Sequence, residues 1–223
     1  LVMFCLMSAD AFAAFGGFVP LSWSGQVAYN YGYLESAGNE SESTSLLLSA
    51  NATGYIWRPW FATTSMALSV GLSNTETSTS SSDSSVATGG FSLGVFPGSR
   101  FPFSMSYSLT DSRSESFQDI SRASGDTAFQ VKRLSLRQSY RPRLYGQLYN
   151  AWYYQTEFDG DSFSSESVVY GLDYSLRLSH QTLAASFTHS GTKARDTEGE
   201  PTIDTASVNH VYTPSPELGV NSL

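Results

Sequence analysis

The sequence predicts an all-β protein whose antiparallel strands follow one another up and down in a meander. Apolar and small polar residues alternate along most of the chain, a period of two that is typical of strands with one apolar face. Charged residues make up only 14% of the sequence, whereas about 25% is usual in soluble domains. Short turns and longer polar connections follow each other in turn. Together these features favour a transmembrane β-barrel over a soluble sandwich.

The first residues form a separate segment. Leu1 to Met7 is apolar and is followed by small residues, and Ala11-Phe12-Ala13 fits an A-x-A cleavage site. We therefore predict that residues 1–13 are the remnant of a secretory signal peptide and that residues 14–223 form the mature domain. The alternative is a short buried apolar segment. The only cysteine, Cys5, lies in this leader, so the mature domain is expected to contain no disulfide.

Ten strands are predicted in the mature domain, and the alternation is clearest from Phe101 to Thr110. At Lys132 and Arg133 the pattern is interrupted, which predicts a β-bulge. An eleventh strand is expected to begin near Leu218. The ten predicted strands span residues 21–34, 44–57, 60–73, 86–96, 101–111, 127–140, 144–156, 166–178, 182–191 and 203–212.

The connections between these strands are sorted by length. Short turns, several with Pro or Gly, are expected at residues 58–59, 97–100, 141–143, 179–181 and 214–216. Longer polar loops are expected between them, at about 35–43, 74–85, 112–126, 157–165 and 192–202. All short turns then lie at one end of the sheet and all long loops at the other. Soluble sandwiches have no reason to sort their connections in this way.

Charged and aromatic residues follow the same division. Seventeen of the 20 acidic residues fall in or beside the long loops, whereas Arg58, Arg100, Arg141 and Arg143 lie in or beside short turns. Aromatic residues gather towards both ends of the strands, which predicts two girdles at the lipid–water interfaces. The alternative is that aromatic residues simply favour strands. The predicted girdle residues are Trp57, Trp60, Phe61, Phe101, Tyr140, Tyr145, Tyr31, Tyr33, Tyr153 and Tyr154.

In these features the chain resembles Gram-negative outer-membrane β-barrel proteins of the porin-like class, over nearly all of residues 21–223. The resemblance rests on architecture and on no diagnostic motif. It implies an outer-membrane location, short turns in the periplasm and acidic loops outside the cell. It also implies contact with outer-membrane lipid and lipopolysaccharide, and with the barrel-assembly machinery. Because strand ten is followed by the start of another, the barrel is predicted to be truncated and to have at least twelve strands when complete.

No catalytic or metal constellation stands out in the sequence. The three histidines, His180, His189 and His210, lack ligand spacing and cysteine partners, so we expect neither a metal site nor a cofactor. We also expect no enzymatic activity, because no nucleophile or phosphate-loop motif is present. The net charge of −8 argues against nucleic-acid binding. The acidic loops are interpreted as a solvated exterior. A weaker interpretation is divalent-cation binding by Asp159, Asp161 and Glu166.

A charged patch is predicted on the lumen wall. If the leucines of two strands face outward, Arg133, Arg137 and Arg177 face inward, with Asp173 nearby. One interpretation is an internal ion pair that braces the barrel. The other is a constriction that attracts anions.

The function expected from these features is a pore or conduit for a polar solute or polymer, because small uncharged side chains leave room for water. The alternative is a non-transporting structural or adhesion barrel whose long acidic loops bind partners. A soluble or autotransporter-type β protein is a third interpretation. The identity of the solute and the oligomeric state are left open.

Overall fold

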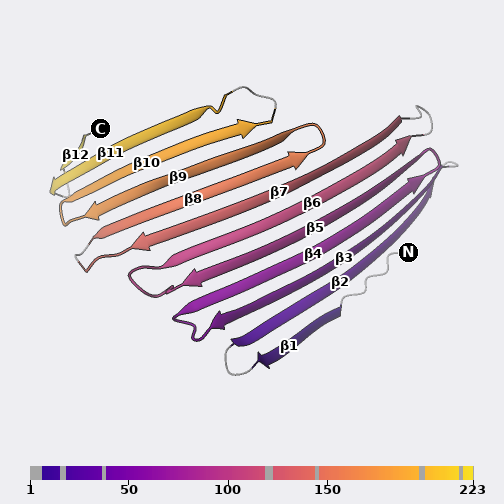
Figure 1. Cartoon of the computed structure of the whole chain (residues 1–223), viewed down its shortest axis with the longest axis horizontal. Helices are drawn as coiled ribbons and strands as arrows, with labels where there is room; N and C mark the ends of the chain where they lie inside the picture. Colours follow the sequence, from indigo (N-terminus) through magenta and orange to yellow (C-terminus); the bar gives the residue numbers. More distant parts are fainter. Residues whose placement is uncertain are drawn as a thin grey trace.

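The computed structural model describes residues 7–15, 19–36, 39–118, 123–143, 146–195, 199–215 and 218–222. These residues form one antiparallel sheet of twelve strands in which every strand pairs with its neighbours in the chain (Figure 1). The predicted all-β meander is confirmed. The strands are β1 (Met7–Phe15), β2 (Val19–Ser36), β3 (Asn39–Ile56), β4 (Ala62–Thr77), β5 (Ser80–Val95), β6 (Phe103–Gln118), β7 (Ala123–Tyr140), β8 (Gln147–Gly160), β9 (Ser164–Arg177), β10 (Gln181–Ala194), β11 (Thr202–Ser215) and β12 (Leu218–Ser222).

The ten predicted strands correspond to β2–β11, and the expected start of an eleventh is β12. The structure adds β1, whose residues pair with β2 from Met7↔Val27 to Phe15↔Val19. This strand overlaps the segment assigned to the signal peptide, and that assignment stays a prediction. In the described residues β2 pairs with β1 and β3, and β11 pairs with β10 and β12. The sheet is therefore not closed between β2 and β11, and truncation of the barrel stays a prediction.

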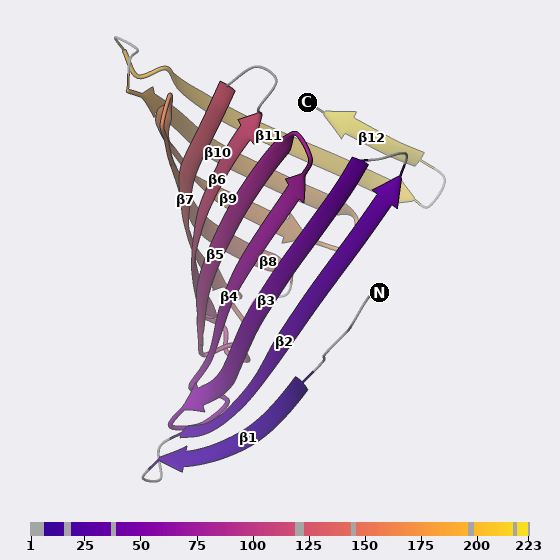
Figure 2. The ribbon, with the colours of Figure 1, turned by 90° about the vertical axis from the view of Figure 1, so that its right-hand side faces the viewer.

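The sheet is strongly curved. Figure 2 shows that it bends along its length, so that the strands of the β8–β11 half pass behind those of the β3–β6 half. Such curling follows from the right-handed twist of antiparallel strands and is the geometry from which barrels are built. The sheet accordingly has two different sides, and each strand presents alternate residues to them.

The fold has a single layer and almost no conventional core. Among the described side chains, the only buried apolar residues are Ala28 and Ala62. A soluble sheet of this size would cover one face with a second layer, because an exposed apolar face of this extent is unstable in water. No described helix is long and apolar enough to cross a membrane.

The predicted long loops are largely wrong. Strand pairing continues to Ser36↔Asn39 between β2 and β3, and to Glu76↔Ser81 between β4 and β5. Most of these polar segments are therefore the outer parts of long hairpins. Serine and threonine are polar enough to suggest loops, but backbone pairing proceeds without an apolar face. Side chains add cross-strand bonds, such as the one from Asn74 Nδ2 to Asp83 Oδ1 at 2.7 Å.

The predicted bulge at Lys132 and Arg133 is also wrong. These residues pair in unbroken register with Leu109 and Ser108 of β6 and with Glu157 and Thr156 of β8. The alternation changes there for another reason. Lys132 lies at the position on its side of the sheet where charged residues replace apolar ones. It therefore interrupts the apolar alternation while the strand keeps its regular pleat.

Candidate functional site: the polar face of the sheet

The strand register divides the sheet into a polar face and an apolar face. One transverse row of paired residues contains small polar side chains almost throughout, running Thr53, Ser65, Ser92, Ser106 and Ser135 from β3 to β7. The hydroxyl groups of Ser65 and Ser92 lie 2.6 Å apart across this row. We call the side that carries these residues the polar face.

The next row lies on the opposite side and contains mostly large apolar residues. It runs Ala52, Met66, Phe91, Tyr107 and Leu134 over the same strands. We call this side the apolar face. Both rows keep their character over five consecutive strands, which is the pattern the alternation in the sequence predicts.

The apolar face is the more exposed of the two. In β4, Met66, Leu68, Val70 and Leu72 are exposed, whereas Ser65, Ser69 and Ser73 on the polar face are half-buried. Leu68 is 58% exposed, and in other strands Leu172 reaches 60% and Val208 62%. This order is the reverse of that in a soluble protein, where apolar side chains are buried.

An arginine–aromatic strip interrupts the small residues of the polar face. It consists of Arg133 and Arg137 of β7, Trp152 and Tyr154 of β8, and Asp173 of β9. Arg137 pairs directly with Trp152, and Tyr154 lies two pairs further along, opposite Ser135. Arg133, Arg137 and Tyr154 are exposed, whereas Trp152 is half-exposed. The strip thus places two cations beside two aromatic rings whose centroids are 5.3 Å apart.

Asp173 accepts a hydrogen bond from Trp152 and does not pair with a described arginine. The Trp152 Nε1–H donates to Asp173 Oδ2 at 3.1 Å. Within the described residues, neither Arg133 nor Arg137 forms an ion pair with a carboxylate. The ion pair that would brace the barrel through these residues is therefore not formed. The reason is the register, because β8 separates the arginines of β7 from Asp173 of β9.

Arg177 shares the polar face with the strip but is separate from it. It lies six residues beyond Gly171, the β9 partner of Trp152, which corresponds to about 20 Å along the strand. Of the four residues predicted as a lumen patch, the structure thus groups Arg133, Arg137 and Asp173 around Trp152 and places Arg177 near the short turns. Whether this face lines a lumen stays a prediction.

Gly171 explains how Trp152 fits on the sheet. A Cβ atom at this position would lie 2.5 Å from Trp152 Cζ2 and 2.5 Å from the carbonyl oxygen of Phe187. Only glycine leaves room for the indole to cover β9 at this pair. Trp152 was not among the residues predicted for the charged patch. The signal was available, because Trp152 has the same strand parity as Asn150 and Tyr154.

Aromatic residues form a continuous band at the short-turn end. Trp57, Trp60 and Phe61 contact one another, and Phe61 contacts Phe96 at 5.2 Å between ring centroids. Trp57 and Phe96 have φ values of 62° and 49°, a left-handed conformation that is rare for bulky residues. On the neighbouring strands the rings of Phe101, Tyr140 and Tyr149 stack in sequence, and Tyr174 lies tilted against Tyr149. Tyr145 lies outside the described residues.

At the other end, the predicted girdle residues do not all share one face. Tyr31, Tyr33 and Tyr153 lie on the apolar face, where Tyr153 pairs with Leu136 and Tyr170. Tyr154 lies on the polar face, because neighbouring residues of a strand point to opposite sides. Its assignment to the same girdle as Tyr153 is therefore wrong. Whether the remaining residues meet lipid stays a prediction.

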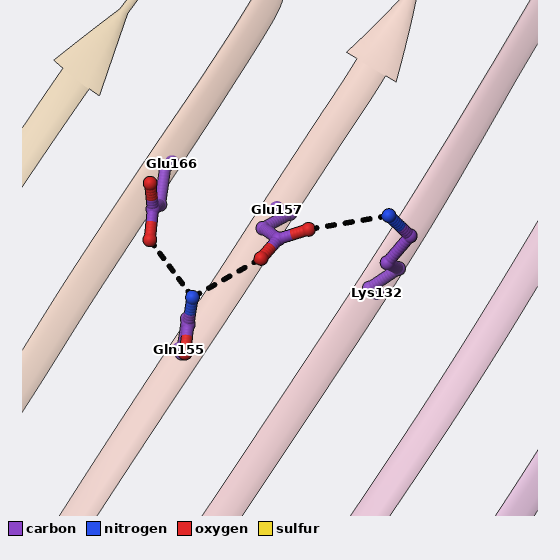
Figure 3. Close-up of polar contacts among 4 residues, drawn as sticks. All are labelled: Lys132, Gln155, Glu157 and Glu166. Atoms are coloured by element: carbon purple, nitrogen blue, oxygen red, sulfur yellow. Dashed lines mark hydrogen bonds and ion pairs between the residues drawn. The ribbon is translucent and has the colours of Figure 1, made fainter.

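Charged residues replace apolar ones on the apolar face beyond Tyr153 and Tyr170. Figure 3 shows three of them, Lys132, Glu157 and Glu166, together with Gln155 on β7, β8 and β9. Lys132 Nζ lies 3.3 Å from Glu157 Oε2. Gln155 Nε2 donates to Glu157 at 3.1 Å and to Glu166 at 2.8 Å, so one amide joins two facing carboxylates. This charged network marks where the apolar part of the face ends.

The network continues to β10, where Lys193 pairs with Glu166 in register and forms an ion pair with Glu200 at 2.8 Å. The hydrogen bond to Glu200, which lies beyond the apolar part of the face, raises the pKa of Lys193. The carboxylates considered for a divalent cation do not converge. Asp161 accepts from the Ala128 N–H at 2.7 Å, while Glu166 accepts from Gln155. Among the described residues, no group of three or more potential ligands is arranged to hold a metal ion.

Comparison with known proteins yields likeness in structure only. No protein-family model matches the sequence, and no curated protein matches it. A siderophore receptor, PiuA of Acinetobacter baumannii, aligns with 95% of this chain at 7% identity and a TM-score of 0.53, and the chain spans 46% of that receptor. The translocator domain of the autotransporter NalP from Neisseria meningitidis aligns with 92% of the chain, at 11% identity and a TM-score of 0.39, over 80% of its own length.

The β domain of the Bordetella autotransporter BrkA also aligns with 92% of the chain, at 13% identity and a TM-score of 0.40, over 88% of its own length. At these identities the likeness concerns the fold alone. The chain has the antiparallel up-and-down fold of outer-membrane β-barrels.

Proposed function

We propose that the chain forms the wall of a β-barrel in a bacterial outer membrane and serves as a conduit for a polar solute or polymer. The observation that carries the proposal is the exposure of the apolar face, with Leu68, Leu172 and Val208 each about 60% exposed. In water such a face would cause aggregation, whereas a bilayer covers it without a second protein layer.

The dimensions of the strands support a membrane location. Strands of about 9–11 residues span a bilayer, and β2–β11 have 14–18 residues. The additional residues of each strand lie in the polar hairpin ends. The remaining part of each strand forms an apolar band, bounded by the aromatic residues at the short turns and by the charged network. A band of this kind matches the apolar belt of a transmembrane barrel.

The polar face supports a conduit. Over β3–β6 it is lined mostly by Ser, Thr, Gly and Ala residues, and two pairs of hydroxyl groups, Ser65 with Ser92 and Ser69 with Thr88, each lie 2.6 Å apart. These short side chains leave space inside a closed barrel and offer hydroxyl groups to water. The short turns then face the periplasm and the long hairpins the exterior. Outer-membrane lipid, lipopolysaccharide and the barrel-assembly machinery are the expected partners, and the proposal includes no enzymatic step.

A non-transporting adhesion barrel is the second candidate, and the long hairpins favour it. Their outer parts are paired, polar and acidic, so they form defined surfaces for a partner outside the cell. In this case the polar face would be closed off, and the hairpins would carry the function.

Conductance in planar bilayers separates the two candidates. Protein purified in detergent from the outer membranes of cells that produce it is first tested for heat-modifiable migration, which reports a folded barrel. The conduit predicts stepwise ionic current on insertion. A folded, inserted barrel without current contradicts the conduit and leaves adhesion, whereas a chain that is recovered without detergent contradicts both.

A further inference from the structure

The arginine–aromatic strip contains charged and aromatic side chains that the folding of a barrel does not require on its polar face. Over β3–β6 this face is built mostly from small uncharged residues, but here two arginines stand beside two rings. Both guanidinium groups are exposed and lack a carboxylate partner within the described residues. Cations left unpaired in a chain with a net charge of −8 indicate that their counter-charge comes from a ligand.

The aromatic residues add a second requirement. Trp152 is fixed in one orientation, because Asp173 accepts from its indole N–H and Gly171 leaves room beneath the ring. Tyr154 is 44% exposed and lies between the levels of Arg133 and Arg137. A fixed, half-exposed indole and an exposed phenol ring next to polar groups suit a ligand with an apolar flat side and polar edges. Pyranose sugars have this shape, since their axial C–H groups make one ring face apolar while hydroxyl groups surround it.

We propose that the strip binds an acidic oligosaccharide, with sugar rings stacked on Trp152 and Tyr154 and acid groups paired with Arg133 and Arg137. The inference rests on the proposed function, because it assumes that the polar face is accessible to a solute. Arginine suits the acid group, since its planar fork binds a carboxylate with two parallel hydrogen bonds.

The spacing of the strip fits a chain rather than a single small anion. Arg133 and Arg137 are four residues apart on one strand, about 13 Å, so a compact anion cannot bind both. A polymer that follows the strand direction would meet one arginine, then Tyr154 on the neighbouring strand, and then the second arginine with Trp152 directly opposite. The strip is therefore assigned to successive units of one chain.

Binding in detergent micelles tests the proposal without requiring conductance. The probes are fluorescently labelled oligogalacturonate, which is an acidic sugar, a maltodextrin of similar length, which is neutral, and polyglutamate, which is acidic but contains no sugar. We expect the folded protein to bind oligogalacturonate at least about tenfold more tightly than either control, because each control lacks one of the two contacts.

Variants assign the contacts. An Arg133→Gln/Arg137→Gln double variant is expected to weaken oligogalacturonate binding at least about tenfold and to remove its salt dependence. The matched control, Arg141→Gln/Arg143→Gln at a short turn, makes the same change in charge and should bind like the parent. Tyr154→Leu should weaken oligogalacturonate but not polyglutamate. Because Tyr154 is exposed, this variant keeps the barrel folded.

The binding results that overturn the inference differ from the result that overturns the conduit. If oligogalacturonate and maltodextrin bind equally well, the arginines do not contribute to recognition. If polyglutamate binds as tightly as oligogalacturonate, the sugar rings do not contribute. Equal losses in the two double variants mean that the charge acts non-specifically. A protein that conducts but does not bind oligogalacturonate contradicts this inference alone, whereas one that binds but does not conduct contradicts only the conduit.

Discussion

Replacing Leu172 by arginine tests which side of the sheet meets lipid. Leu172 lies on the apolar face of β9, near the middle of the apolar residues that run from Val168 to Leu178. It is 60% exposed and pairs with Ala151 and Phe187. Because its neighbours on both adjacent strands are apolar, an arginine at this position finds no carboxylate on the adjacent strands and must face hydrocarbon.

The expected magnitude follows from this depth. An arginine on the lipid face near the bilayer midplane costs about 2–4 kcal/mol, which lowers the folding equilibrium constant about 30- to 900-fold. Ser175→Arg is the matched change on the same strand. Ser175 lies on the polar face, opposite Leu148 and Ala184, so the new guanidinium reaches water. We expect it to lower stability by less than about 1 kcal/mol.

Urea-induced unfolding of the two variants in lipid vesicles measures the difference, and heat-modifiable migration of membrane fractions measures assembly. Leu172→Arg should shift the unfolding midpoint to lower urea and reduce assembly, while Ser175→Arg stays near the parent. Equal effects of the two changes would refute the assignment of the apolar face to lipid. A larger effect of Ser175→Arg would reverse it.

Two further substitutions test local features. Gly171→Ala should destabilise the sheet by about 1–3 kcal/mol, because the added Cβ meets Trp152 and a backbone carbonyl. The control Gly90→Ala lies on the same face with its nearest neighbour 3.9 Å away and should have little effect. Urea unfolding of both variants measures the difference, and equal losses of stability would contradict the role of Gly171 in making room for Trp152. Gln155→Leu should cost about 1 kcal/mol by leaving two facing glutamates without their shared donor. This loss should shrink at about 0.5 M salt, since screening weakens the repulsion; a loss independent of salt would contradict the reasoning.

Much of the fold follows from the alternation in the sequence. The period of two requires strands, and the alternating turns and connections require an antiparallel meander, so β2–β11 could be predicted in order. The length of the hairpins could not. Residues such as Ser81 and Ser82 have no apolar period to mark a strand, and their pairing with β4 and β6 depends on backbone bonds that composition does not reveal.

The candidate site was predictable only in part. The parity of Arg133 and Arg137 on one strand places them on one face, and the structure keeps them there. What they stand beside depends on the register between strands. A shift of two pairs between β7 and β8 would keep both faces but place another residue opposite Arg137, and the alternation within either strand does not distinguish the two registers. The partner of Asp173 was missed for the same reason.

In the proposed barrel, the paired hairpin ends would set a height above the membrane. From Leu72, the last apolar residue of β4, to the turn at Ser78 and Thr79 is about 20 Å of ribbon. Its backbone groups are bonded across the hairpin, and its tip is closed by the bond of Thr77 to Ser80 at 3.1 Å. Proteases need unpaired backbone to bind in their clefts, so these ribbons resist cleavage that would remove flexible loops. If the barrel lies in the outer membrane as proposed, these stiff hairpins with hydroxyl side chains would keep large molecules at a distance from the bilayer surface.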